Sequence, residues 1–527
     1  MPRKISFFVL PIIAIGLMAL SFLTIQEIKA QINSFTYFIP IMTDDLNDMY
    51  DQAVDEEGNA RNLAGGTCGE LGGTGLSLSD EDMVETIVLA IERDNTIVFY
   101  DHWEDGYEAD LTAVPHQAST EIWGDGDPTN GTRTGPTDLL VGGVPILLQN
   151  TVTAPRNPGT IFYDGGDKLS GTGGFLSLVR SAWPVCSDTL FAGAWELYPT
   201  NRWGAEYIIP VGEDLVGAGP STFSDGFRTV DLSVQAAVDN TAVEFDLNAD
   251  GTFGGAGDIP NVTLNEGKSQ AVFANAVLTG ARVRSTNAIS PVQVQILLGD
   301  SNEVPNFYEA RAYTLTPRDQ LANDYIAPRS SDGLYWIHNP NGTAITVNPT
   351  TNAGPQPPLV IAAGQTTPFD PGAAPTGARF QSADNFYGLV TLDASFTQDW
   401  GYSLQPVNNL TAQVVVGWGV GDSNVPPTTN HSRVYVTAVT TTTVEIDYNN
   451  DGITDTPAIQ ILPLQEVPIT DPDFDLSGAK FFTTDDKPFV AVWGQDEGAV
   501  AGVPAIDVGT NVVPVPALKL KKSFLEQ

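Results

Sequence analysis

Two segments of the chain combine acidic side chains and a glycine at the spacing of a calcium-binding loop. In the more complete one, oxygen-bearing side chains stand at the first, third, fifth and ninth positions, namely Asp447, Asn449, Asp451 and Asp455. The backbone carbonyl of Ile453 falls at the seventh position, and Gly452 supplies the tight turn. Calcium takes hard oxygen ligands of this kind. We therefore predict a calcium ion here, although Ala458 replaces the bidentate glutamate usual at the twelfth position.

Earlier copies of this segment keep part of the same pattern. The first half is reproduced by Asp246, Asn248 and Asp250. Further upstream, Asp101 and Asp105 align with the same positions, but Trp103 takes the place of the middle oxygen ligand. Asp-Gly and Asn-Gly pairs are also favoured in hairpin turns, because they accept positive φ angles. Each segment is therefore either a cation site or an ordinary turn, and both alternatives stay open at this point.

The segment DHWEDGYE at residues 101–108 brings a histidine, an aromatic residue and several carboxylates together. It supports an alternative function, a carbohydrate-binding or carbohydrate-active protein with Glu104 or Asp105 as acid or base. Trp103 and Trp123 would then stack on a sugar. Clustering of these four side chains around one cleft would favour this alternative, and dispersal over loops would favour a protein that is not an enzyme. The remaining histidines are scattered and give no zinc pattern, and the sequence has no Ser-His-Asp signature. Our leading prediction therefore has no catalytic residues.

Each acidic segment follows a short strand that begins with the same turn. The phrase reads DNTIVFYDHWEDG at residues 94–106, DNTAVEFDLNADG at residues 239–251 and TTTVEIDYNNDG at residues 441–452. A weaker copy at residues 341–348, NGTAITVN, keeps the turn and the strand without the acids. Alternation of apolar and polar residues in EFDL and VEID buries one strand face and leaves the other in water. The chain is therefore organised as four repeats of one β unit.

Each unit holds about six or seven short strands, which is the strand count of a β-sandwich. We predict an all-β protein of four antiparallel, Ig-like sandwich modules, with a β-propeller-like closure of the repeats as the alternative. The predicted units are residues 31–206, 207–324, 325–410 and 411–510. Loops are expected at residues 44–82, 124–135 and 164–174, within the first unit. Residues 511–527 form a C-terminal tail or the first strand of a further module.

Composition and the chain ends indicate an exported protein. Asp and Glu total 64 against 24 Lys and Arg, and the net charge of -40 argues against a nucleic-acid partner, whose phosphates need a basic surface. Arg3 and Lys4 precede an apolar run at residues 5–25, which is typical of an export signal (residues 1–30) cleaved after Ala30. The long run leaves an uncleaved membrane anchor as the alternative. We expect a secreted or cell-surface protein with an unidentified extracellular protein or glycan partner.

The chain has two cysteines, Cys68 and Cys186. In an oxidising compartment outside the cytoplasm, they can form one disulfide that closes a long loop. Two free thiols are the alternative, because two residues do not define a disulfide framework.

Four motifs resemble a known family: LAIERDNTIVFYD, WELYPTNRWGAEYIIP, VQAAVDNTAVEFD and GAKFFTTDDKPFVAVWG. They are similar to the N-terminal region of IgGFc-binding proteins and its bacterial relatives. The resemblance extends over most of residues 85–495 and rests on short, mainly structural motifs. It implies a shared fold and a secreted or surface protein with an adhesive or structural role, and no residue here identifies IgG binding itself. Calcium would stiffen the loops of such a protein.

Overall fold

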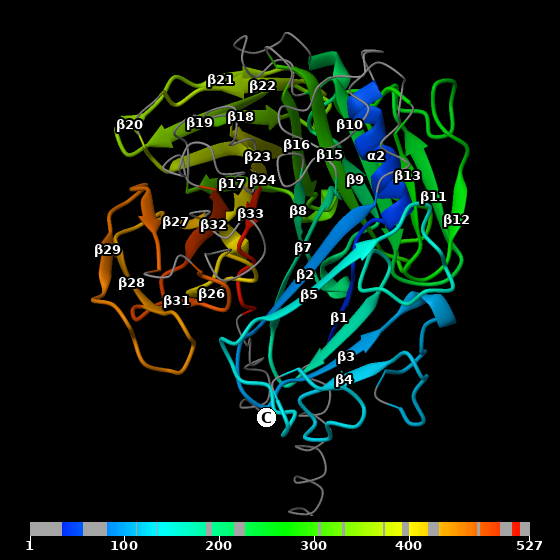
Figure 1. Cartoon of the computed structure of the whole chain (residues 1–527). Coiled ribbons are helices and arrows are strands. Elements are labelled where there is room, and N and C mark those ends of the chain that lie inside the picture. The colour runs from blue at the N-terminus through cyan, green and yellow to red at the C-terminus, as the bar shows by residue number, and fades with distance from the viewer. Residues whose placement is uncertain are drawn as a thin grey trace, which may run out of the picture.

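The structure is a computed structural model that describes residues 34–55, 82–111, 113–133, 135–185, 192–215, 227–273, 275–303, 307–328, 333–372, 375–392, 400–419, 432–471, 475–495 and 508–516. They form four β-sandwiches in succession along the chain (Figure 1). Both cysteines, the predicted export signal and most of the C-terminal tail lie outside these residues. Within them, no helix is long and apolar enough to cross a membrane.

The first two sandwiches each pair two four-stranded sheets. The first has the sheets β1-β6-β3-β4 and β5-β2-β7-β8, with β1 (Ser34–Phe38), β2 (Met83–Ile91), β3 (Ile97–Asp101), β4 (Glu121–Trp123), β5 (Ile146–Val152), β6 (Lys168–Thr172), β7 (Leu176–Pro184) and β8 (Gly193–Glu196). The second has the sheets β12-β11-β14-β9 and β13-β10-β15-β16, with β9 (Glu206–Ile208), β10 (Thr229–Ala236), β11 (Thr241–Asp246), β12 (Val262–Leu264), β13 (Ser269–Val272), β14 (Arg282–Ser285), β15 (Val292–Glu303) and β16 (Phe307–Thr314).

The third sandwich joins its two layers through one long strand. It contains β17 (Ala322–Ala327), β18 (Gly333–His338), β19 (Ile345–Thr351), β20 (Gly354–Pro355), β21 (Leu359–Ile361), β22 (Thr366–Phe369), β23 (Ala378–Leu392), β24 (Gly401–Ser403) and β25 (Gln405–Pro406). The first half of β23 pairs with β17 and β19, and its second half pairs with β18 and β24. The two layers therefore count as one nine-stranded sheet.

The fourth sandwich returns to two four-stranded sheets, β26-β31-β28-β29 and β30-β27-β32-β33. Its strands are β26 (Gln413–Val415), β27 (Ser432–Ala438), β28 (Thr442–Asp447), β29 (Ile459–Ile461), β30 (Val467–Ile469), β31 (Lys480–Thr483), β32 (Phe489–Gln495) and β33 (Gly509–Asn511). The strand order matches that of the first and second sandwiches. The predicted all-β fold of repeated antiparallel sandwich units is confirmed.

The repeated DNT turn carries the chain from one sheet of a sandwich to the other. In the second sandwich it lies between β10 and β11, which belong to opposite sheets. Asn240 takes a positive φ of 57°, and the Thr241 hydroxyl donates to the Val238 carbonyl at 2.7 Å. Asn tolerates this left-handed conformation better than most residues, which explains the recurring turn sequence.

The two sheets of a sandwich differ in how they are buried. In β11 and β28, buried residues alternate with partly exposed ones, so one face of their sheet meets solvent. In β7, β10 and β18, every residue is buried. These strands belong to the sheets that end in β8, β16 and β24. Protein must therefore cover both faces of the inner sheets at these strands.

Neighbouring sandwiches supply that second cover. Leu334 and Trp336 of the third sandwich pack into the core of the second, and Val88 and Trp183 of the first pack into the core of the fourth. The strands β8, β16, β24 and β33 lie near the centre of the molecule, each against the corresponding strands of the two neighbouring sandwiches (Figure 1). The four sandwiches form a ring in which each member is a two-layer module rather than a single propeller blade.

Two segments that the sequence predicts as loops contain regular structure among their described residues. Residues 44–82 begin with the helix α2 (Thr43–Asp55), whose Leu46, Met49 and Tyr50 are spaced three and four residues apart and pack toward the second sandwich. Within residues 164–174, β6 pairs with β1 and β3. Gly171 looked like a loop residue, but the Leu176 side chain fills the space where its Cβ would stand. Trp123, one of the two tryptophans considered for stacking on a sugar, ends β4.

Candidate functional site

The fourth sandwich brings most of the predicted calcium ligands together directly after β28. The Asp451 N–H donates to Asp447 Oδ1 at 3.0 Å and to Asn449 Oδ1 at 3.1 Å. The Gly452 N–H donates to Asp447 Oδ2 at 2.8 Å. Asp455 instead accepts the Tyr448 N–H at 2.8 Å. Asp447, Asn449 and Asp451 thus share one tight loop, and Asp455 closes its far end. Ile453 lies at the exposed tip of the loop.

This loop also touches the first sandwich. The Asn450 side-chain amide donates to the backbone carbonyl of Glu92 at 2.8 Å and to that of Ile91 at 3.3 Å. A Cβ built on Gly143 would lie 2.0 Å from the Asn449 carbonyl oxygen, so the two backbones are in close contact. The predicted cation loop therefore stands at the boundary that closes the ring.

The loop after β11 holds its first aspartate differently. Asp246 is fully buried and accepts Arg282 Nη2 at 2.6 Å and the Gly251 N–H at 3.2 Å, both on Oδ2. Its Oδ1 has no hydrogen-bond partner among the described residues. Asn248 accepts the Asp250 N–H at 3.1 Å, and Asp258 closes the loop by accepting the Leu247 N–H at 2.7 Å.

The two aspartates predicted in the first sandwich serve different neighbours. Asp101 is buried and accepts the Glu108 N–H at 2.9 Å, and burial raises the pKa of its carboxyl to about 6. Asp105 accepts the Ser119 hydroxyl at 2.6 Å. In place of a calcium loop, this part of the chain forms a dense polar network around His102.

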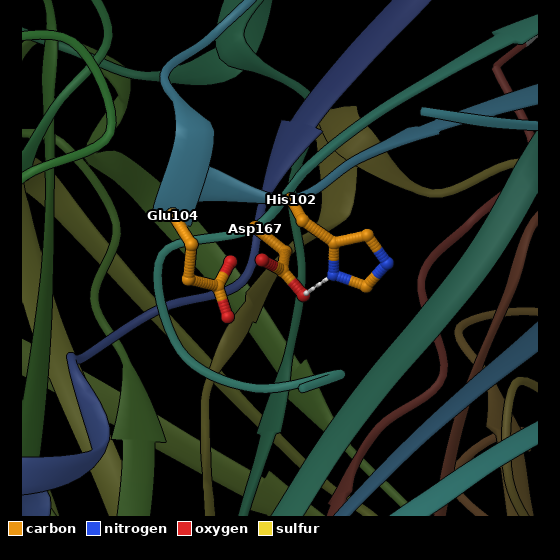
Figure 2. A group of neighbouring side chains, drawn as sticks. All are labelled: His102, Glu104 and Asp167. Atoms are coloured by element: carbon orange, nitrogen blue, oxygen red, sulfur yellow. Dashed lines mark ion pairs between the residues drawn. The ribbon is translucent and has the colours of Figure 1, made fainter. Parts of the chain in front are cut away.

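The centre of this network is the group His102, Glu104 and Asp167, shown in Figure 2. One ligand-type atom of each lies within 4.8 Å of the others, the one such group of three found among the described His, Cys, Asp and Glu residues. The carboxyl groups of Glu104 and Asp167 turn toward each other (Figure 2). His102 Nδ1 lies 2.8 Å from the Phe162 carbonyl oxygen and 3.4 Å from Asp167 Oδ2.

His102 is held in its cationic form. Burial disfavours the imidazolium, but the neighbouring acids Asp167 and Glu121, 3.4 and 3.9 Å from its ring nitrogens, outweigh this and raise the pKa of His102 to about 10. Burial alone would raise the pKa of the Glu121 carboxyl. The neighbouring His102 and the hydrogen bond from Tyr163 outweigh burial and lower this pKa to about 2. The imidazolium therefore bridges two carboxylates, and its Nδ1–H is committed to the Phe162 carbonyl.

The Arg156 side chain neutralises Glu104 and Asp164. Arg156 Nε lies 2.6 Å from Asp164 Oδ2, and its Nη2 lies 2.5 Å from Glu104 Oε1. Its guanidinium also stacks over the Trp103 ring, at 4.8 Å from the centroid. A metal at this group would have to displace the proton on His102 Nδ1 and its bond to Phe162. We therefore interpret the group as a buried ion-pair network rather than a metal centre.

The four side chains of the carbohydrate alternative do not line one cleft in the described structure. Trp103 packs between Arg156 and Lys268, whose Nζ lies 3.9 Å from the ring centroid, and so joins the first sandwich to the second. Trp123 is fully buried under Arg133, at 4.5 Å. Two cavities of the described structure lie elsewhere, one beside Tyr198 and Gln405 and the other beside Glu206 and Arg284.

Sequence reasoning missed the partners that make this network. Asp164 and Asp167 lie in a Gly-rich segment that the sequence predicts as a loop. Arg156 is distant in sequence from the DHWED motif, and its basic side chain gives no acidic pattern to search for. The signal that was available is the DGGDK sequence at residues 164–168, which corresponds to the start of the Gly-Ala strand in the other units. Its register pairs Lys168 with Asp101.

Comparison with known proteins gives one family match. A family model described as IgGFc binding protein matches residues 193–494, more than half of the chain. No curated protein matches the chain. A solved structure of a biofilm associated protein, its BSP domain, is similar at 9% identity over 82% of this chain and 90% of its own, with a TM-score of 0.12, and carries no argument. The predicted resemblance is confirmed by the family match, and the chain belongs to the IgGFc-binding protein family.

Proposed function

We propose that this chain is an exported cell-surface or extracellular-matrix protein with an adhesive or structural role. The family to which it belongs is described by a binding activity, which supports a binding role here. The partner we propose is an extracellular protein or glycan. Immunoglobulin is one candidate, and no residue of the described structure singles it out.

The observation that carries this proposal is the ring of sandwiches. Central strands of its inner sheets are buried on both faces, and its outer sheets turn one face to solvent. The acidic loops lie at the ends of outer strands. Such an arrangement holds many loops in fixed relative positions, which suits a protein that presents surfaces to partners. Loops that present binding residues on a rigid scaffold are a common means of recognition.

Calcium belongs to the proposal as a stiffening ion in the loops of Asp447 and Asp246, with the Asp101 and Asp105 segment a weaker candidate. Support comes from the shared loop of Asp447, Asn449 and Asp451 and from the unpartnered Oδ1 of Asp246. The buried network around His102 argues against extending the same role to Asp101 and Asp105.

A binding screen with the exported protein tests this function. The protein would be purified from the medium or cell surface and titrated against immobilised matrix proteins, mucins, immunoglobulin Fc and glycans, with and without calcium. We expect saturable binding to at least one protein or glycan and no release of sugar from a polysaccharide panel. Turnover of a polysaccharide that is lost in Glu104→Gln would contradict the proposal and establish the carbohydrate-active alternative.

A further inference from the structure

The loop between β4 and β5 contains a second kind of acidic cluster, outside all the predicted sites. Its members are Asp125, Asn130 and Asp138. The Asn130 side-chain amide donates to Asp125 Oδ2 at 2.9 Å. The Gly124 N–H donates to Asp138 Oδ2 at 3.0 Å, and the carboxyl groups of Asp138 and Asp125 lie close enough to share a hydrogen bond if one carries a proton. Asp125 therefore contacts both of the other side chains.

Two oxygen atoms of this cluster are buried and unused. Asp138 is 0% exposed, and its Oδ1 has no hydrogen-bond partner among the described residues. Asn130 Oδ1 is also buried without a hydrogen-bond partner among the described residues, although the Asn130 amide nitrogen donates to Asp125. Buried polar atoms in native proteins nearly always have partners, and a buried carboxylate oxygen without one is especially unfavourable. These two atoms indicate a missing ligand.

No side chain of the described structure neutralises the cluster. Neither Asp125 nor Asp138 forms an ion pair with a described residue. Arg133, from the same loop, lies 3.1 Å from Glu121 and stacks over the Trp123 ring, so its charge is used elsewhere. Burial, together with the neighbouring Asp125, raises the pKa of the Asp138 carboxyl despite the hydrogen bonds from the backbone N–H groups of Gly124 and Arg133. The pair of carboxyl groups therefore favours a proton or a cation between them.

We propose that Asp125, Asn130 and Asp138 bind a hard divalent cation, calcium by preference. An all-oxygen ligand set suits calcium or magnesium and not zinc or copper, which favour nitrogen or sulfur ligands. A shared proton would satisfy one carboxyl oxygen and leave Asn130 Oδ1 without a partner, whereas a cation bound by all three side chains would satisfy both unpartnered oxygen atoms. Asp125 is exposed, so water completes the coordination from the open side.

Terbium luminescence with the full-length protein tests this site. Terbium replaces calcium at oxygen sites and emits when a nearby indole is excited. A Cβ built on Gly131, next to Asn130, would lie 2.9 Å from the Trp123 indole, so Trp123 is the local antenna. We expect indole-sensitised emission that calcium displaces, and at least about a tenfold weaker affinity in Asp138→Asn and in Asp125→Asn. Asn at position 138 keeps an oxygen acceptor for the Gly124 N–H.

The Asp451→Asn variant is the matched control, because it alters the loop of the fourth sandwich. It should leave the Trp123-sensitised signal unchanged, and calorimetry should show one calcium site lost in each of the Asp125 and Asp451 variants. Wild-type affinity in both Asp125→Asn and Asp138→Asn would overturn the proposal. If Asp138→Asn does not fold, the exposed Asp125 variant decides alone. Loss of the Asp451 site only would contradict this proposal and leave the calcium role of Asp447 standing.

Discussion

The aspartates that end β3, β11 and β28 stand at equivalent positions but have different partners. The strand register places a cationic residue opposite each of them, Lys168, Arg282 and Lys480 in turn. Arg282 forms an ion pair with Asp246 at 2.6 Å. Asp447 has no ion pair among the described residues and accepts two backbone N–H groups. Because Arg282 competes with a cation for Asp246, the Asp447 loop should bind calcium more tightly.

This difference predicts how calcium affects stability. Chelation should lower the melting temperature, and added calcium should restore it, because the folded loop binds the ion better than the unfolded chain does. At a hundredfold excess over the dissociation constant, binding at one site adds about 3 kcal/mol to the free energy of unfolding. Asp451→Ala should remove more of the response than Asp250→Ala. Scanning calorimetry in EDTA and in calcium measures both.

Ionic strength is the control that this measurement needs. A net charge of -40 makes the folded protein self-repelling, and screening alone relieves that repulsion. Sodium chloride at equal ionic strength should therefore give only part of the stabilisation. If it gives all of it, the acidic loops are hairpin turns without a bound ion.

At the scale of elements, neighbouring sandwiches meet where two turns are in backbone contact. Gly478, which precedes β31, has a φ of +85°, and a Cβ at this position would lie 2.1 Å from the Gly143 carbonyl oxygen of the first sandwich. Gly372 has nearly the same φ, +87°, but its Cβ would meet nothing within 4 Å. The two glycines therefore separate the cost of the left-handed backbone from the cost of the contact.

We predict that Gly478→Ala lowers the free energy of unfolding by about 2 to 5 kcal/mol, from backbone strain and the clash together. Gly372→Ala should lower it by about 1 to 2 kcal/mol, from strain alone. Urea unfolding of the two variants measures the difference. Equal losses would show that the contact between the first and fourth sandwiches relaxes without cost.

Local patterns were sufficient for the strands and the acidic loop of Asp447, because a DNT turn and an alternating strand act within a dozen residues. Local patterns were insufficient for α2, because its apolar face of Leu46, Met49 and Tyr50 is stabilised by packing against the second sandwich. The Asp138 cluster was missed for a related reason. Its three members are separated by Gly-rich sequence, and only the folded loop brings their oxygen atoms together.

At the scale of the whole molecule, Glu196 of β8 joins the first sandwich to the fourth. Its carboxylate is 2% exposed and accepts hydrogen bonds from the Thr510 hydroxyl and, at 2.9 Å, from the Asn511 amide of β33. The titratable groups facing it are Tyr198, whose hydroxyl lies 3.4 Å away, and Tyr387. No described cation pairs with it. Glu196 is thus a buried acid held by neutral partners at the centre of the ring.

This environment makes the closure of the ring dependent on pH. Burial raises the pKa of Glu196 from its ordinary 4.5 to about 7, because the ionised form loses hydration that neutral donors replace only in part. The folded protein therefore holds the proton more tightly than the unfolded chain does. The resulting stability is fully present below pH 4.5 and is lost as the pH rises through 7. Contact between β8 and β33 should be strongest in mild acid.

Glu196→Gln tests this directly, because glutamine imitates the protonated side chain at every pH. We predict that the variant is more stable than the natural protein by about 3 kcal/mol at pH 8 and by less than about 1 kcal/mol at pH 5. Urea unfolding at both pH values measures the free energies, and hydrogen exchange of β33 shows whether the change lies at the contact with β8. Glu206→Gln, which alters a side chain 28% exposed on the surface, is the control and should give a small difference that is the same at both pH values. A Glu196→Gln variant that is destabilised equally at pH 5 and pH 8 would mean that the carboxylate is held in its charged form across this range, and that the ring closes independently of pH.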